Sequence, residues 1–181
     1  RSSDLEVGDG VLLRGKIDRI EIETHTGGDV EFLIGDYKTG RLGNLPGNAP
    51  IRKGESLQMP LYAAAARKLL ARHYGLNAEP SGAVYYTLTP ERNKNGETES
   101  HRFVLLPKDT PLGQTRKSRS SETVAGSEER EQMIAESIHF AKTYIDGITG
   151  GRFTVEPVDR AKTCAYCSFH PVCRIREATP E

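Results

Sequence analysis

The chain has 181 residues, of which 36 % are hydrophobic and 28 % are charged, the ordinary balance of a soluble globular protein. We expect one domain over residues 1–181, which is long enough to bury a sizeable core. No apolar run approaches the roughly 20 residues of a membrane-spanning helix, and no signal-peptide pattern begins the chain. The clustering of the cysteines, described below, leads us to expect a cytoplasmic protein. Because the first residue is Arg1 and not methionine, we expect a C-terminal fragment of a longer protein.

The net charge gives no argument for nucleic-acid binding. Lysine plus arginine and aspartate plus glutamate each total 25, so the formal net charge is zero. Any contact with nucleic acid must therefore come from a local basic surface. Three segments are candidates, although a solvated face is the simpler interpretation of each one alone: Arg14, Lys16 and Arg19; Arg67, Lys68 and Arg72; Arg116, Lys117 and Arg119.

The first half of the chain reads as a hairpin, a loop and a helix. Branched residues and alternation predict a strand at 11–23, and a glycine-rich turn connects it to a second strand at 30–38. Glycines and prolines of turn type predict a loop at 39–56. A helix should follow at 57–73, because four apolar residues recur every four positions as a stripe: Leu57, Leu61, Ala65 and Leu69.

The second half predicts another strand pair and a second helix. Strands at 82–88 and 102–106 are joined through a turn, and the polar segment 107–126 is expected to be a mobile loop. The helix at 127–148 has Ser127 as its N-cap, and its expected buried face is Ile134, Ile138, Ala141, Ile145 and Ile148. The order β-β-α-β-β-α predicts an α/β (α+β) fold with a central mixed sheet flanked by helices.

Charged residues occupy apolar faces of the two predicted strands. Asp18 shares a face with Ile20 and Ile22, and Asp36 and Lys38 share one with Ile34. A buried charge needs a partner ion or a metal, so a buried salt bridge from Lys38 to either aspartate is one interpretation. Two carboxylates against one lysine leave excess negative charge, which favours a hard cation such as Mg²⁺.

Three short motifs carry a resemblance to a known family. GKIDRI at 15–20, IGDYKTG at 34–40 and QMPLY at 58–62 resemble, in order and spacing, successive motifs of RecB/AddB-type nucleases of the PD-(D/E)XK superfamily. Each motif alone is weak or moderate evidence, whereas the three in sequence, followed by a cysteine cluster, are strong. The resemblance implies a restriction-endonuclease-like core.

The resemblance also implies residue roles. Asp18 and Asp36 would bind Mg²⁺ or Mn²⁺, together with the backbone carbonyl of Tyr37, and Lys38 would orient the attacking water. Gln58 and Tyr62, four residues apart on the predicted helix, would support the metal site or position DNA. Without the resemblance, these two would read as a surface amide and a half-buried aromatic residue.

All three cysteines lie at 164–173, spaced C-x2-C-x5-C. The clustering of Cys164, Cys167 and Cys173 indicates a metal or cluster site in a reducing compartment, not a secreted disulfide framework. In AddB-like nucleases and CRISPR-associated iron–sulfur exonucleases, which this pattern resembles, such cysteines and one far upstream hold a [4Fe–4S] cluster. A fourth ligand is therefore expected upstream of Arg1. A Cys3His zinc site with His170 and three free thiols are the alternatives.

These patterns favour an enzyme. The expected activity is a Mg²⁺- or Mn²⁺-dependent DNA exonuclease of recombination and repair, working with a helicase. The alternatives are a non-catalytic DNA-binding or scaffold module of the same fold, and a metal- or cluster-binding structural module. The intact set of Asp18, Asp36 and Lys38 argues against a scaffold, which has no need of three costly charges. Neither a GxSxG motif nor a phosphate-binding glycine loop occurs.

Overall fold

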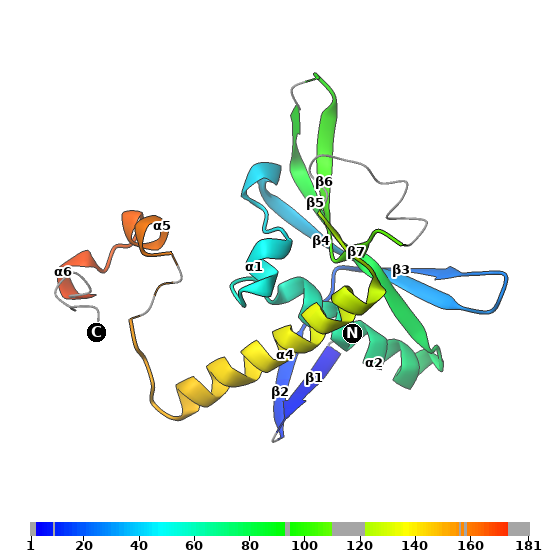
Figure 1. Ribbon diagram of the computed structural model, residues 1–181, viewed down its shortest axis with the longest axis horizontal. Coiled ribbons are helices and arrows are strands. Elements are labelled where there is room, and N and C mark those ends of the chain that lie inside the picture. The colour runs from blue at the N-terminus through cyan, green and yellow to red at the C-terminus, as the bar shows by residue number, and fades with distance from the viewer. Residues whose placement is uncertain are drawn as a thin grey trace. The chain divides into compact units, whose positions relative to one another are not determined.

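A computed structural model describes residues 3–8, 10–92, 95–109, 122–155, 157 and 159–173 (Figure 1). The chain divides into two compact units, Arg1–Lys142 and Thr143–Glu181, which are described separately here. Among the described helices, none has the length and apolar character needed to cross a membrane.

A four-stranded mixed sheet forms the centre of the first unit (Figure 1). Its order is β3 (Arg19–Thr24), β4 (Val30–Arg41), β5 (Ala78–Arg92) and β6 (Thr98–Val104). The β3–β4 and β5–β6 pairs are antiparallel, as the predicted hairpin requires, whereas β4 and β5 are parallel. A parallel pair needs a crossover connection, and a helix supplies it. The predicted α/β class with a central mixed sheet is confirmed.

The N-terminal segment forms a hairpin that belongs to a separate sheet. Strands β1 (Ser3–Gly8) and β2 (Val11–Gly15) pair with each other, and β3 begins only at Arg19. The prediction of one strand over 11–23 was therefore wrong. The two halves of that segment pair with different partners, so the chain must leave the strand conformation between them. Asp18 lies in this break and is exposed, and it does not lie on an apolar strand face.

Helix α2 (Gln58–Tyr74) makes the crossover between β4 and β5. It ends at Gly75, whose φ of 64° suits a left-handed C-cap. The helix contacts β5, β4 and β1. The predicted stripe was wrong in phase, because Leu57, Leu61 and Leu69 are only partly buried. The most deeply buried positions recur with helical spacing instead at Met59, Ala63, Ala66 and Leu70.

The predicted loop 39–56 contains ordered structure. Strand β4 continues to Arg41, and two short helices follow, η1 (Leu42–Asn44) and α1 (Asn48–Arg52). Asn48 in α1 is buried, and its amide bridges two other segments. Its Oδ1 accepts a hydrogen bond from the backbone N–H of Leu105 at 2.9 Å, and its Nδ2 donates to the carbonyl of Glu122 at 3.1 Å.

Strand β6 ends one residue before a backbone kink. Leu105 has a φ of 55°, so the predicted strand 102–106 is interrupted there. The chain continues as β7 (Leu106–Pro107), which pairs in parallel with β8 (Thr123–Val124). Part of the predicted loop 107–126 is thus a strand. Residues 110–121 of that loop, and Asn93 and Lys94 of the predicted turn, lie outside the described residues.

Helix α4 (Ser127–Thr149) confirms the second predicted helix, with a different buried face. Its buried residues are Arg130, Met133, Ile134, Ser137 and Ala141. Of the predicted set, Ile138 and Ile145 are partly buried and Ile148 is exposed, because burial is confined to the first two thirds of the helix. The second unit contains the end of α4 and two short helices, α5 (Arg160–Ala165) and α6 (His170–Cys173).

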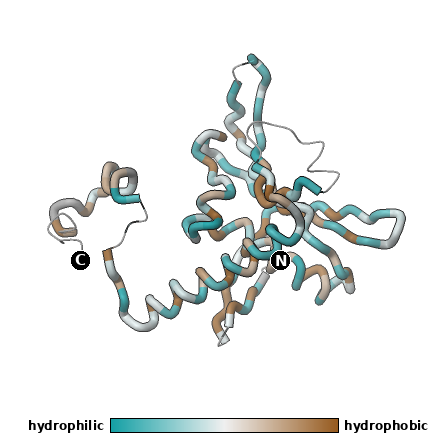
Figure 2. Tube along the Cα trace, in the orientation of Figure 1, coloured by the Kyte–Doolittle hydropathy of each residue, from teal (hydrophilic) through white to brown (hydrophobic). Residues whose placement is uncertain are grey.

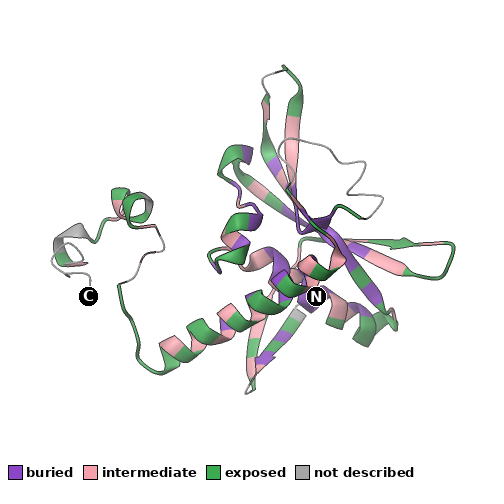
Figure 3. Ribbon diagram, viewed as in Figure 1, coloured by how far each residue is buried: buried purple, intermediate pink, exposed green. Residues whose placement is uncertain are grey.

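The core of the first unit lies along the two central strands. Ile34 on β4 and Val84 and Tyr85 on β5 are fully buried, as is Phe32 within 1 %. Figure 3 shows buried residues along β5 and exposed ones at the hairpin tips. Figure 2 shows hydrophobic and hydrophilic positions alternating along the strands, as expected where one face is packed more tightly than the other.

We predict that Asn48→Ala lowers the free energy of unfolding by about 1–3 kcal/mol, because the buried N–H of Leu105 loses its acceptor. Urea unfolding monitored by circular dichroism measures the change. Asn44→Ala, at an exposed position of the neighbouring short helix, is the matched control and should shift the midpoint far less. Equal shifts in the two variants would contradict the role of Asn48.

Candidate active site

An ion pair on the central strand β4 is the centre of the candidate site. The period of two along β4 places Asp36 and Lys38 on one face with Ile34. Asp36 is only 4 % exposed, and its Oδ2 lies 2.8 Å from Lys38 Nζ. Within the described part of the chain, this oxygen accepts no aligned hydrogen bond. The buried carboxylate is thus neutralised in charge while one oxygen keeps unused acceptor capacity.

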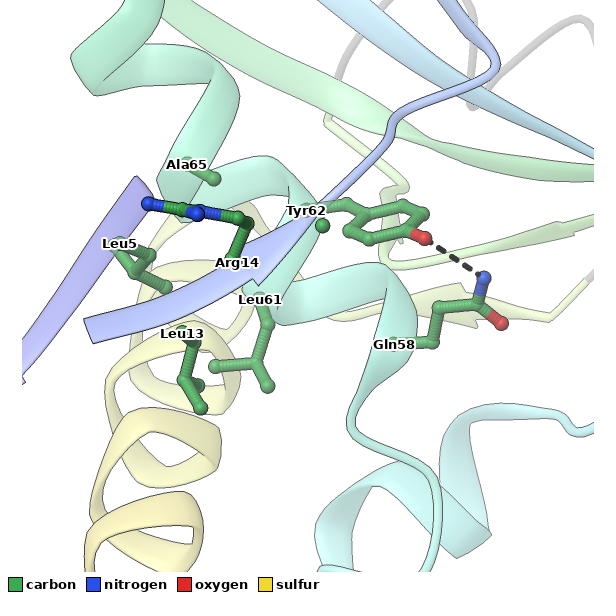
Figure 4. A pocket seen from close by; sticks show the side chains of 8 residues that line it. Leu5, Leu13, Arg14, Gln58, Leu61, Tyr62 and Ala65 are labelled. Carbon is green, nitrogen blue, oxygen red and sulfur yellow. Dashed lines mark hydrogen bonds between the residues drawn. The ribbon is translucent and has the colours of Figure 1, made fainter. Parts of the chain in front are cut away.

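Gln58, the first residue of α2, connects both members of the ion pair. Its Oε1 accepts a hydrogen bond from Lys38 Nζ at 2.8 Å, and its Nε2 donates to Asp36 Oδ1 at 2.7 Å. The same Nε2 lies 3.3 Å from the hydroxyl oxygen of Tyr62, one helical turn later, which Figure 4 shows as a dashed line. The two residues therefore share a face of α2, as predicted, and that face borders the ion pair.

Asp18 joins the site through the backbone of β4. Arg19 pairs with Gly35 in the β3–β4 ladder, and the same register continued by one residue places Asp18 opposite Asp36. Asp18 Oδ2 accepts a hydrogen bond from the N–H of Tyr37 at 3.1 Å. The structure therefore brings both predicted carboxylates to the same end of the β3–β4 pair. They differ in environment, because Asp18 is exposed and Asp36 is buried.

Side chains on the opposite face of the sheet connect the same strands to each other in a clamp. Arg19 donates to the Tyr37 hydroxyl at 3.1 Å and pairs with Glu21 at 2.9 Å. Tyr86 donates to Glu21 at 3.2 Å and stacks on Tyr37 with ring centroids 5.4 Å apart. These contacts join β3, β4 and β5 directly behind Asp36, so they fix the register on which the site depends.

Gly35 allows close packing of these side chains over β4. A Cβ atom at position 35 would approach Arg19 Cβ and Tyr86 Cε2 to 3.2 Å each, which is tighter than ordinary van der Waals contact. The glycine of the IGDYKTG motif therefore lets the two side chains close over the strand that carries Asp36.

Sequence reasoning did not single out Tyr85, which lies below the ion pair. Tyr85 pairs with Asp36 across the β4–β5 ladder, and the centroid of its ring lies 5.9 Å from Lys38 Nζ. Burial, with a smaller contribution from the Asp36 charge, raises the pKa of Tyr85 to about 12. Ser56 lowers the pKa of Tyr85 by less than burial raises it. Among the described residues, the Tyr85 hydroxyl makes no aligned hydrogen bond. The parity of the predicted strand 82–88 was the only signal available for it.

Comparison with known proteins identifies the family. Residues 1–174 match the PD-(D/E)XK nuclease superfamily. The chain belongs to this superfamily. The match spans all three motifs and the cysteine cluster. It therefore includes Asp18, Asp36 and Lys38. The recognition made from the motifs, including its RecB/AddB type, is confirmed.

A curated relative supports the assignment. The nuclease domain is 27 % identical over 211 residues to a protein of Moorella thermoacetica that is named as one subunit of an ATP-dependent helicase/deoxyribonuclease. The similarity covers 97 % of this chain but 18 % of that protein. The nuclease domain therefore corresponds to a small part of the relative.

The residues at the site suit a divalent metal ion, which nucleases of this superfamily generally use. Asp36 Oδ2 is a buried carboxylate oxygen without an aligned hydrogen bond, and Asp18 is held beside it by the Tyr37 amide. Hard cations favour such oxygen donors and keep several waters, so two carboxylates and a carbonyl can suffice. No group of three or more acidic, histidine or cysteine side chains that could hold a metal is present among the described residues.

Several other predicted residues do not converge on the site. Arg14 pairs with Asp4, and Arg67 pairs with Glu79 and Glu131, so these basic side chains are partly compensated. The segment with Arg116, Lys117 and Arg119 lies outside the described residues. Cys164, Cys167 and Cys173 belong to the second unit, are partly buried and are not joined by disulfide bonds. They do not form a three-ligand metal group there, and the side chain of His170 is not described.

We predict that Tyr85 makes folding stability fall between pH 10 and about 12. In this range the unfolded chain ionises at the ordinary tyrosine pKa of 10, whereas the folded state holds its proton up to a pKa of about 12. The folded state then binds more protons, so stability is fully present below pH 10 and falls by up to about 1.4 kcal/mol per pH unit above it. Denaturant unfolding of Tyr85→Phe across this range should show a flatter decline than the parent chain. Tyr74→Phe, at an exposed tyrosine, should retain the parent slope.

Proposed function

We propose that this nuclease domain is a Mg²⁺- or Mn²⁺-dependent deoxyribonuclease that hydrolyses phosphodiester bonds as an exonuclease. One observation carries the proposal. A buried carboxylate, Asp36, is joined to Lys38 both directly and through Gln58, and Asp18 is tied to the adjoining peptide. Two anionic metal ligands and one cation at a single point suit metal-dependent phosphodiester hydrolysis, in which the metal ion polarises the phosphoryl group and activates water.

Each residue of the candidate site has a proposed role in this hydrolysis that agrees with its contacts. Asp18, Asp36 and the backbone carbonyl of Tyr37 would hold the metal ion, which polarises the phosphoryl group and lowers the pKa of a bound water. Lys38 has three N–H donors, of which one bonds Gln58, while its amine also lies 2.8 Å from Asp36 Oδ2 as an ion pair. A further donor can orient the attacking water or offset charge on the scissile phosphate. Gln58, held in turn beside Tyr62, keeps the Lys38 amine at this position.

A non-catalytic scaffold of the same fold is the alternative. Its weakness is energetic, because a buried ion pair is often no more stabilising than well-packed apolar residues of similar volume. A scaffold gains nothing from keeping Asp36 and Lys38 of the core strand β4 in mutual contact with Gln58 of α2. The same contacts are what a reaction centre requires, since they fix donor and acceptor atoms before substrate arrives.

We predict that Asp36→Asn and Lys38→Ala each lower metal-dependent cleavage by at least about 100-fold, since the first weakens the metal site and the second removes the amine beside the reacting phosphate. The measurement is cleavage of end-labelled single-stranded DNA in Mg²⁺ or Mn²⁺, with thermal melting to confirm folding. The matched control is Asp29→Asn, at the other end of the β3–β4 hairpin, and it should cut like the parent chain. Cutting that survives both active-site changes would place the reaction elsewhere.

The relative's printed name supports a wider assignment. That protein is described as part of an ATP-dependent helicase/deoxyribonuclease, so we propose that this domain acts on DNA beside a helicase, on the same chain or as a partner. DNA recombination and repair in the cytoplasm is the corresponding role.

We further propose that the three cysteines bind a [4Fe–4S] cluster. Cys164 and Cys167 occupy one turn, and Cys167 Sγ accepts a hydrogen bond from the backbone N–H of Phe169 at 3.4 Å. Large apolar side chains of this unit are exposed, among them Tyr166 at 94 %, so the described part buries little core. Small units of this kind usually need a metal or a covalent staple. A cluster takes four thiolates, so the fourth ligand must be a group other than these three.

We predict that anaerobic incubation with iron and sulfide gives the chain bound iron and visible absorption, and that Cys167→Ser lowers both, because a thiolate ligand is lost. Ser168→Ala, at the adjacent exposed residue, is the control and should retain both. Binding of zinc without iron would favour the alternative zinc site. Equal metal content in the two variants would contradict a role for Cys167.

A further inference from the structure

A pocket with apolar walls opens beside the candidate active site. It lies between the β1–β2 hairpin and helix α2 and has a volume of about 220 Å³. Leu5 and Leu13 from the hairpin and Leu61 and Ala65 from the helix form its walls (Figure 4). The two helix residues belong to the apolar stripe predicted from the sequence. Part of that stripe therefore lines a cavity.

The mouth of the pocket is shared with the catalytic network. Gln58 and Tyr62 line the pocket, and Gln58 also contacts Asp36 and Lys38 directly. A group bound in the pocket would therefore lie immediately beside whatever occupies the carboxylates. If that is a phosphodiester, as the proposed function requires, the adjoining group is part of the same nucleotide chain.

The charges at the rim suit a polyanion. Arg14 lines the pocket and pairs with Asp4 at 3.0 Å, with both side chains exposed. Exposed ion pairs of this kind contribute little, so Arg14 can exchange Asp4 for a phosphate at small cost. Lys16 is exposed and lies between Arg14 and Asp18 in the chain. Two cations thus lie along the segment that leads from the pocket to the metal-binding end of the site.

We propose that this pocket takes one unpaired nucleobase of the DNA strand, next to the phosphate that is cut. The inference rests on the proposed nuclease function. The pocket is smaller than the roughly 300–1,000 Å³ of sites for drug-sized ligands, which suits a single planar heterocycle. The Tyr62 ring and the leucines offer apolar contact to a base, and base–aromatic stacking tolerates any sequence.

The glycine of the first motif fits this use. A Cβ atom at Gly15 would lie 3.5 Å from Tyr62 Cε1, so any longer side chain would extend along the Tyr62 ring into the pocket. A base can enter only when it is unpaired and unstacked, and extracting one from a duplex costs free energy. The pocket therefore selects single strands or frayed ends over intact duplex.

The test is a scan of abasic positions along an end-labelled single-stranded oligonucleotide, with cleavage measured at every phosphodiester. An abasic nucleotide at one fixed distance from the cut should lower cleavage about 5- to 100-fold, the loss that corresponds to the stacking of one base. Leu13→Phe, which fills the pocket, should cut intact DNA as slowly as the parent cuts the abasic strand, with no further loss on the abasic strand. Leu12→Phe, the same change at the exposed neighbouring residue, should behave like the parent.

Two further measurements keep the outcomes distinct. Ala65→Leu fills the pocket from the helix side and replaces Leu13→Phe if that variant fails to melt like the parent chain. Fluorescence of 2-aminopurine, moved along the same oligonucleotide bound to Asp36→Asn, reports base insertion without cleavage and should change at one position only. Cleavage with no position-dependent abasic effect would overturn the pocket and leave the nuclease intact. Absence of cleavage would count against the proposed function, and a uniform 2-aminopurine signal would then overturn the pocket as well.

Discussion

Burial of the Asp36 carboxylate is the constraint on which the site depends. A charged group on a core strand is tolerated only when nearby groups compensate its charge and use its acceptor positions. Lys38 supplies the charge from the same strand, and Gln58 supplies a hydrogen bond to one oxygen. The other oxygen forms the ion pair with Lys38 but accepts no aligned hydrogen bond, so it keeps acceptor capacity that a metal ion could use. The contacts that make the buried Asp36 charge tolerable are therefore the same contacts that form the candidate site.

The route of the chain before β3 places the second carboxylate. The β1–β2 hairpin and the central sheet are separate, so residues 16–18 must turn between them. Asp18 occupies the last position of this turn, opposite Asp36 in the continued register and bonded to the Tyr37 amide. On the other face, Arg19, Tyr37 and Tyr86 hold the register in place. A slip by one residue would turn Asp36 outward.

The sequence was sufficient for the fold class, the order of most elements and the positions of Asp36 and Lys38, because these rest on periodicity within single segments. Errors arose where a partner far along the chain decides the outcome. Val11–Gly15 and Arg19–Thr24 read as one strand, since only pairing with β1 and β4 separates them. Tyr85 was missed because its importance comes from lying across the ladder from Asp36. The buried face of α2 was predicted wrongly for a related reason. Alanines and leucines recur with helical spacing along two different faces of this helix, and only packing against the sheet decides which face is buried.

Helix α2 shows why a single stripe was the wrong expectation. Met59 and Leu70 bury one face in the core, Gln58 and Tyr62 present another to the ion pair, and Leu61 and Ala65 line the pocket. A helix that serves three surfaces has apolar residues around much of its circumference, so periodicity alone gives no unique inward direction. Gln58 belongs both to the ion-pair network and to the lining of the pocket. Helix α2 therefore positions the amide that contacts Asp36 and Lys38 and also supplies one wall of the pocket.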